Sequence, residues 1–170
     1  EANEAMLKLA RRHAWARGEK ERVRLVAFHN AFHGRTMGAV ALTGTPKYHE
    51  GFGPMVGGIT HVAYGDLAAV EAVMGPDVAG IFVEPVQGEG GVLPAPAGFL
   101  AGLRALADRH GALLLIDEVQ TGVGRTGAWF ACDRDVVVPD ILVIGTALGN
   151  GFPVTALAMR EELAEALSAA

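Results

Sequence analysis

Short runs of apolar residues alternate along the chain with longer segments in which apolar positions recur at helical spacing. A short continuous apolar run is typical of a strand buried on both faces, whereas a period of about 3.6 residues indicates an amphipathic helix. The runs predict strands at residues 24–28, 60–63, 79–84, 112–117 and 141–144, and a further, antiparallel candidate at 154–159. Helical spacing predicts helices at residues 2–17, 36–42, 66–74, 96–110 and 160–170. Because strands alternate with helices, we expect an α/β fold: a mostly parallel sheet with helices on both faces and right-handed crossovers.

Turn-forming residues separate these elements. Residues 44–58 hold many Gly and Pro residues and predict a long loop, and residues 87–91 predict a glycine-rich loop. Asp66 is placed to cap the helix that follows it, and Gly111 to end the helix before it. Residues 118–139 show no clear period, so we expect irregular structure there.

Composition narrows the class of protein. The chain has 170 residues, 51% of them hydrophobic, which is enough for one domain with a substantial core. A net charge of −5 and the lack of a basic run argue against nucleic-acid binding. No apolar run reaches membrane-spanning length, no signal peptide is visible, and the single cysteine, Cys132, cannot form an internal disulfide. We therefore expect a cytoplasmic protein that has neither nucleic acid nor a membrane as its partner.

Both ends of the chain look cut. Glu1 lies almost directly before a predicted helix, and residues 160–170 fall inside another. We therefore expect residues 1–170 to be the central part of a longer protein, with N-terminal and C-terminal segments missing.

Acidic residues follow two of the predicted buried strands. Asp117 comes directly after an apolar run, as does Glu84, and each is followed three residues later by a glutamine. A second glutamate, Glu89, lies in the glycine-rich loop after Glu84. Because ligands of open parallel sheets bind beyond the carboxyl ends of the strands, these carboxylates are candidates for a ligand site. The alternative is that they only cap helices or lie exposed at strand ends.

Other local patterns are weaker. Residues 122–127 match the dinucleotide pattern G-x-G-x-x-G, but no helix opens there and no suitable acidic residue follows. Residues 113–118 resemble the acidic strand of a nucleoside triphosphatase, yet no glycine loop ending in Gly-Lys-Ser/Thr exists. His29 and His33 have the spacing of metal ligands but lack a third ligand, so polar loop histidines are favoured over a metal site. Cys132 has no paired histidine and fits an incidental thiol better than a nucleophile.

Six longer motifs follow one another along the chain. They are Glu1-Ala-Asn-Glu-Ala5, Phe32-His-Gly-Arg-Thr36, Glu84-Pro-Val-Gln-Gly-Glu-Gly-Gly-Val92, Leu115-Ile-Asp-Glu-Val-Gln-Thr-Gly-Val-Gly-Arg-Thr-Gly127, Pro139-Asp-Ile-Leu142 and Ala147-Leu-Gly-Asn-Gly-Phe-Pro153. Together they resemble the class III pyridoxal-phosphate aminotransferases, most of all the acetylornithine and ornithine aminotransferases. The resemblance implies the large, cofactor-binding domain of a fold-type-I transferase, with pyridoxal 5′-phosphate as cofactor. It also implies transfer of an amino group from N-acetylornithine or a similar ω-amino substrate to 2-oxoglutarate, as in arginine biosynthesis.

The resemblance assigns roles to single residues. Asp117 would face the pyridine nitrogen of the cofactor and keep it protonated, so that the ring can accept electrons. Phe32 would stack on the ring, and Gln120 would hydrogen-bond its 3-oxygen. Glu89 would neutralise or release a substrate-binding arginine, and Glu84 would support that pocket.

One departure from the family pattern bears directly on activity. Where the family has the lysine that forms a Schiff base with the cofactor, this chain has Thr146. A hydroxyl cannot form that bond and is a poor base, so we expect the chain as written to be inactive or severely impaired. Asn150 and Thr155 also replace glycines of the family pattern. The chain's lysines, none of which ends a predicted strand, are Lys8, Lys20 and Lys47.

Two alternatives to an active enzyme stay open. One is a non-catalytic relative that binds the cofactor or a partner without chemistry. The other is an engineered or truncated piece in which only the fold matters.

The resemblance also implies partners. Amino acids and 2-oxo acids would be the small-molecule substrates, and the full-length protein would be a homodimer whose active site is completed across a two-fold interface. The loop 44–58, with Phe52 and Met55, is apolar for a loop and is a candidate contact in that dimer.

Overall fold

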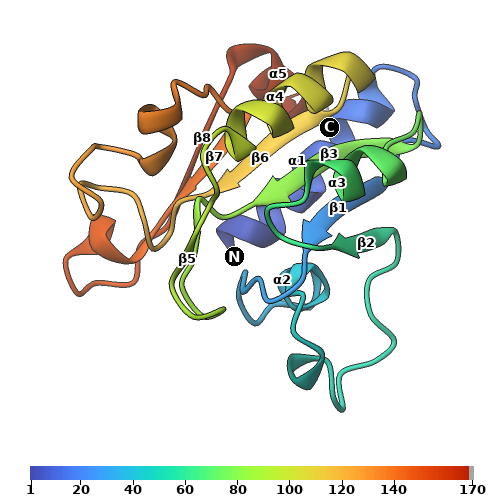
Figure 1. The fold of residues 1–170 in the computed structure, drawn as a ribbon. Coiled ribbons are helices and arrows are strands. Elements are labelled where there is room, and N and C mark those ends of the chain that lie inside the picture. Colours follow the sequence, from blue (N-terminus) through green and yellow to red (C-terminus); the bar gives the residue numbers. More distant parts are fainter. Residues whose placement is uncertain (169–170) are drawn as a thin grey trace.

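A sheet of parallel strands runs through the centre of the computed structural model, which describes residues 1–168 (Figure 1). Its strands, in order across the sheet, are β2 (Ile59–Val62), β1 (Arg24–Phe28), β3 (Val78–Val83), β6 (Leu113–Asp117), β7 (Ile141–Ile144) and β8 (Ala156–Met159). All neighbours are parallel except β8, which pairs antiparallel with β7. The parallel strands therefore present their carboxyl ends at one common edge.

Helices cover both faces of this sheet. On one face lie α1 (Ala2–Ala16) and α5 (Glu161–Ser168), and on the other lie α3 (Leu67–Val73) and α4 (Phe99–His110) (Figure 1). A short helix, α2 (Met37–Leu42), packs against α1, and 3-10 turns occur at η1 (Pro46–Tyr48), η2 (Ala131–Asp135) and η3 (Thr146–Gly149). Within the described part of the chain, no helix is long and apolar enough to cross a membrane.

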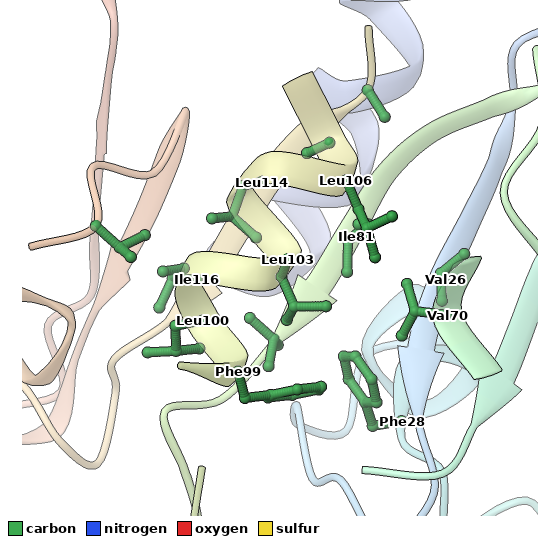
Figure 2. Packing of buried hydrophobic residues seen from close by; sticks show 14 of the residues in the cluster. Val26, Phe28, Val70, Ile81, Phe99, Leu100, Leu103, Leu106, Leu114 and Ile116 are labelled. Carbon is green, nitrogen blue, oxygen red and sulfur yellow. The ribbon is translucent and has the colours of Figure 1, made fainter. Parts of the chain in front are cut away.

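The alternation of side chains along the central strands produces two apolar cores. In β6, Leu114 and Ile116 belong to the core under α3 and α4, which is drawn in Figure 2. Leu113 and Leu115 belong to the core under α1. Successive side chains of a strand point to opposite faces, so a strand covered on both faces must be apolar throughout. The same alternation directs Asp117, the last residue of β6, toward the α1 side.

The predicted α/β fold with a mostly parallel sheet is confirmed. The strands at 24–28 and 141–144 have their predicted bounds, and the antiparallel strand is β8. Asp66 caps α3 as expected, because its carboxylate accepts a hydrogen bond from the backbone N–H of Ala69 at 3.0 Å. Of the predicted last helix, residues 169–170 lie outside the described residues.

Some boundaries differ from the prediction, and one pair of strands was not foreseen. The expected loop at 87–91 is mostly the turn of a small hairpin in which β4 (Val86–Gln87) pairs with β5 (Leu93–Pro94). α4 begins at Phe99 rather than at residue 96, because Gly98 has a left-handed backbone with a φ of 78° and cannot join the helix. The hairpin strands β4 and β5 have two residues each, and β5 contains a proline, so the sequence shows no hydrophobic period that would predict them.

A close backbone contact fixes the segment that follows β1. Gly44 forms an isolated parallel bridge with His29, which brings the chain back to the end of β1 after α2. A Cβ atom at position 44 would lie 2.0 Å from the carbonyl oxygen of Phe28. Only glycine allows the two backbones to approach so closely.

Gly44→Ala should therefore lower the free energy of unfolding by about 1–3 kcal/mol, because the backbone has to move to admit the methyl group. Gly57→Ala is the matched control in the same loop, since nothing lies within 4 Å of the added Cβ. Denaturant unfolding of the full-length protein measures both variants. Equal midpoints for the two variants would contradict the expectation.

Candidate active site

A pocket opens at the edge of the sheet where β1, β3, β6 and β7 end. Residues that the sequence analysis discussed and that line it are Phe32, His33, Glu84, Asp117, Gln120, Thr146 and Thr155. The first residues of α1 complete the wall. Residues far apart in the sequence thus meet because the parallel strands end side by side.

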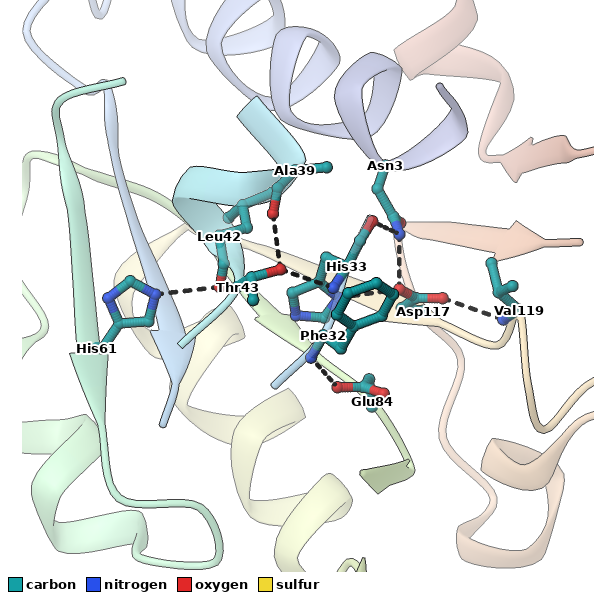
Figure 3. Close-up of polar contacts among 10 residues, drawn as sticks. All are labelled: Asn3, Phe32, His33, Ala39, Leu42, Thr43, His61, Glu84, Asp117 and Val119. Atoms are coloured by element: carbon teal, nitrogen blue, oxygen red, sulfur yellow. Dashed lines mark hydrogen bonds and ion pairs between the residues drawn. The ribbon is translucent and has the colours of Figure 1, made fainter. Parts of the chain in front are cut away.

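Asp117 reaches this pocket from the end of β6 and is only 5% exposed. Its Oδ2 accepts a hydrogen bond from Asn3 Nδ2 at 2.7 Å and lies 2.9 Å from His33 Nδ1 (Figure 3). Its Oδ1 accepts one from the backbone N–H of Val119 at 3.0 Å. Because Asp117 faces the α1 side of the sheet, α1 can supply Asn3. Three N–H donors converge on the carboxylate and stabilise a negative charge there.

His33 lies in the loop after β1, as expected, but it is buried beside Asp117. Its backbone N–H donates to Thr43 Oγ1 at 2.9 Å, and its ring stands edge-on to Phe82 with 4.6 Å between centroids. Burial by itself lowers the pKa of His33. The hydrogen bond to Asp117 and the charges on Glu84 and Asp117 outweigh burial, and the pKa of His33 is raised.

Glu84 follows β3 directly and is also buried. Its Oε1 accepts a hydrogen bond from the backbone N–H of Phe32 at 3.0 Å, which fixes the turn that carries the Phe32 ring. Burial raises the pKa of Glu84 to about 7, with His33 opposing and Asp117 adding to that rise. Near neutral pH this carboxyl group is therefore divided between its protonated and ionised forms.

The ring of Phe32 is held beside the pocket by neighbours in the next loop. It packs edge-on against Tyr48 with 5.4 Å between centroids. The guanidinium of Arg35 lies over both rings, 5.4 Å from the centroid of Phe32 and 4.6 Å from that of Tyr48. Such cation–π contacts hold the aromatic face in place and leave a positive charge near the pocket.

Gln120 lines both this pocket and an adjoining hollow. A Cβ atom at Gly88 would lie 2.0 Å from Gln120 Oε1, so the glycine makes room for the amide. Glu89 lines the adjoining hollow together with Arg125, and does not line the pocket that contains Asp117. The structure thus brings together all the predicted site residues except Glu89, which lies in the adjoining hollow.

Thr146 lines the pocket from the first position of η3, with a φ of 42°. That left-handed backbone is strained for a β-branched residue. Thr155 lines the pocket too, and Asn150 has a φ of 44°, in a conformation that asparagine tolerates. No lysine of residues 1–168 is among the lining residues.

Glu118 organises the loop after β6 and was missed by the sequence analysis. Its carboxylate accepts hydrogen bonds from Thr121 Oγ1 and from the backbone N–H groups of Ala131 and Cys132, each at 2.8 Å. Burial, reinforced by the charge on Glu118, raises the pKa of Cys132 to about 12. The thiol stays protonated at neutral pH, which accords with an incidental cysteine.

Asn3 and Thr43 were also missed. The separation of 114 residues between Asn3 and Asp117 leaves no local pattern that could have revealed their contact. Asn3 lies in the first of the six motifs and at the start of a helix expected on the sheet, but neither signal specifies which side chain it contacts.

The lining suits a planar aromatic ligand with a basic ring nitrogen. Phe32 and Val119 offer apolar surface, Asp117 offers a hydrogen-bonded negative charge, and Gln120 offers an amide. Asn3 Oδ1 is buried against the pocket without a hydrogen-bond partner among residues 1–168, and so can accept from a ligand. In the same residues no cluster of His, Cys, Asp and Glu could hold a metal ion.

Comparison with known proteins points to one family. The family model described as aminotransferase class III matches residues 1–170. The acetylornithine aminotransferase of Myxococcus xanthus is 54% identical over 168 residues, which cover 99% of this chain and 42% of that protein. The chain therefore spans about two fifths of the length of the curated relatives it matches.

Solved structures show the same fold. An ornithine aminotransferase from Toxoplasma gondii, with partial occupancy of PLP at its active site, superposes with a TM-score of 0.93 at 38% identity, covering 98% of this chain and 40% of that one. The N-acetylornithine aminotransferase from Stenotrophomonas maltophilia K279a superposes with a TM-score of 0.81 at 38% identity, covering 97% and 40%.

The raised pKa of Glu84 leads to a pH-dependent prediction for Glu84→Gln, which keeps an oxygen to accept from Phe32. Below the ordinary pKa of 4.5 the carboxyl is protonated in both folded and unfolded states, so the variant should match the parent. As the pH rises from 4.5 to about 7, only the unfolded state ionises and the parent loses stability. Above pH 7 the variant should be more stable by an amount on the order of 2 kcal/mol.

Denaturant unfolding of the full-length protein at several pH values measures this difference. Glu71→Gln, at an exposed glutamate on α3, is the control and should show no such trend. A stability difference for Glu84→Gln that does not grow between pH 4.5 and 7 would show that the folded protein already ionises this carboxyl.

Proposed function

The chain belongs to the class III aminotransferase family, and from this premise we propose that it is the central part of the large domain of a pyridoxal-phosphate-dependent aminotransferase. One observation carries the proposal. Phe32, Asp117, Gln120 and Thr146, which come from three separate segments, line a single pocket at the carboxyl edge of the sheet. That is where open α/β sheets bind their ligands.

Different residues of the pocket would contact different parts of the cofactor. When bound, pyridoxal phosphate supplies an electron-accepting ring through which an amino group is exchanged between two acids. Asp117 would keep a proton on the ring nitrogen, because its own negative charge is stabilised by three N–H donors. Phe32 would stack on the ring and Gln120 would donate to the 3-oxygen. Glu84 would act through Phe32, whose backbone it holds.

We propose an N-acetylornithine-like ω-amino acid as the amino donor and 2-oxoglutarate as the acceptor, with a place in arginine biosynthesis. The names of the Myxococcus xanthus relative and of the Stenotrophomonas maltophilia structure support the donor. Glu89 would neutralise or release an arginine that binds the substrate. Its exposed position in the hollow beside Arg125 supports that role, because the carboxylate is free to exchange partners.

We also propose that the chain as written is inactive or severely impaired. The pocket has a threonine at position 146 and no lysine of residues 1–168. A hydroxyl cannot attach the cofactor's aldehyde as an amine does, and it is a poor base at neutral pH. Binding of the cofactor depends on the other residues of the pocket and is expected to persist.

A second candidate function is a non-catalytic relative that binds the cofactor without chemistry. The threonine at the position of the expected lysine favours it, since the other residues proposed to hold the cofactor line the same pocket. Both candidates predict that the protein binds the cofactor. They differ in whether a lysine at position 146 would by itself restore the reaction.

Thr146→Lys in the full-length protein tests the first candidate. The amine would lie beside a cationic cofactor ring and partly out of water, and both effects favour its nucleophilic form. We expect added pyridoxal phosphate to give a visible absorbance band that borohydride fixes covalently to residue 146, and an ω-amino acid to convert the band.

Thr155→Lys is the control, because it adds an amine to the same pocket at another position. Equal trapping at residues 146 and 155 would mean that the pocket has no defined place for the amine. Trapping at Lys8, Lys20 or Lys47 in the parent protein would refute the assigned site, and a Thr146→Lys variant that binds cofactor without conversion would favour the non-catalytic relative.

We further propose that the full-length protein is a homodimer. The apolar side chains of Phe52, Trp129 and Phe152 are exposed, which supports a second subunit that would cover them. Sedimentation of the full-length protein should give a dimer at micromolar concentration, and Phe52→Asp should weaken it more than the matched surface change Trp15→Asp on α1. A concentration-independent monomer would refute the proposal. The cytoplasmic location stays a prediction.

A further inference from the structure

The ring of His33 contributes a single N–H group to the site. Nδ1 lies 2.9 Å from Asp117 Oδ2, and since an ionised carboxylate only accepts, Nδ1 carries the proton between them. The other ring nitrogen, Nε2, is buried and has no hydrogen-bond partner among residues 1–168. The side chain is completely buried. Within residues 1–168 its one polar contact is therefore the one that Nδ1 makes with Asp117, because Nε2 has no partner.

The backbone at His33 is fixed without any help from this ring. Its N–H donates to Thr43 Oγ1 at 2.9 Å, and its carbonyl accepts from Asn3 Nδ2 at 2.7 Å (Figure 3). Thr43 is held in turn by the carbonyl of Ala39. The Nδ1–H group is therefore not needed to hold its own loop, and its effect falls on Asp117.

We propose that His33 is a positioning residue that sets the orientation and the ionisation of Asp117, so that the carboxylate meets the ring nitrogen of a bound cofactor as an anion. The proposal rests on the proposed function, in which Asp117 faces that nitrogen.

The distribution of donors on Asp117 explains this role. Oδ2 receives both Asn3 and His33, so the carboxylate cannot rotate without breaking two hydrogen bonds at once. Without the N–H of His33 the carboxylate would keep two donors, Asn3 and the backbone of Val119, and would face Glu84, a second buried acid.

A purely packing role for the ring is the competing explanation, because the ring stands edge-on to Phe82 at 4.6 Å. Two substitutions separate packing from hydrogen bonding. His33→Phe keeps an aromatic ring and removes the N–H group. His33→Asn removes the ring and keeps a donor in nearly the same place, since asparagine Nδ2 and histidine Nδ1 are both bonded to Cγ.

The experiment uses the full-length protein with carbon-13-labelled aspartate carboxyl groups and no cofactor, with Asp117→Asn identifying the resonance. His33→Phe should move the midpoint of Asp117 ionisation upward by about one pH unit, a tenfold change in the equilibrium. His33→Asn should stay within about threefold of the parent. His61→Phe is the matched control, because His61 Nε2–H donates to the carbonyl of Leu42 and the residue does not line the pocket.

A second measurement uses pyridoxal phosphate labelled with nitrogen-15 in the ring. His33→Phe should weaken its binding about tenfold, as expected for one lost charge-assisted hydrogen bond, and should move the ring-nitrogen resonance toward the unprotonated form. His33→Asn should restore both properties most of the way to the parent values.

An unchanged Asp117 midpoint in His33→Phe would overturn the proposal, as would identical behaviour of the Phe and Asn variants. If His33→Phe does not fold, His33→Leu replaces it as the variant without a donor. If the parent protein does not bind pyridoxal phosphate, the proposed function fails, while the carboxyl titration, measured without cofactor, still decides the role of His33.

Discussion

The buried carboxylate of Asp117 is the constraint on which the site depends. A charge taken out of water costs several kcal/mol unless it is paired and hydrogen-bonded, so the end of β6 can be buried only if donors come to it. They come from α1 through Asn3, from the loop after β1 through His33, and from the loop after β6 through Val119. Satisfying one side chain thereby brings three separate segments to the same place, and the pocket is the space between them.

The sequence predicted the part of this arrangement that the sheet imposes. Apolar runs that end in Glu84 and Asp117 indicate parallel strands, and parallel strands bring their carboxyl ends together, so the two acids could be expected at one edge. The donors could not be foreseen. His33 lies 84 residues from Asp117 in the chain, and its neighbourhood resembles an ordinary polar loop until the buried face is known.

Loops limited the prediction for a related physical reason. On a strand, alternation fixes which side chains share a face, but a loop has no such rule. Glu89 was therefore expected near Asp117 on sequence distance and resemblance, and in the structure it lines the hollow next to the pocket. Phe32 also lies in a loop, and its place at the pocket was expected only from the family motif, because no hydrophobic pattern marks it as part of a site.

The residue at position 146 matters for the proposed chemistry and little for the stability of the fold. The side chain of Thr146 is exposed at the pocket, and its backbone is held in a left-handed conformation between β7 and η3. Because the side chain of Thr146 is exposed, its identity contributes little to the packing of the fold. The network around Asp117 is different, because it also satisfies a buried charge that folding itself creates. The same network would therefore serve an enzyme and a protein that only binds the cofactor, so its presence does not distinguish the two.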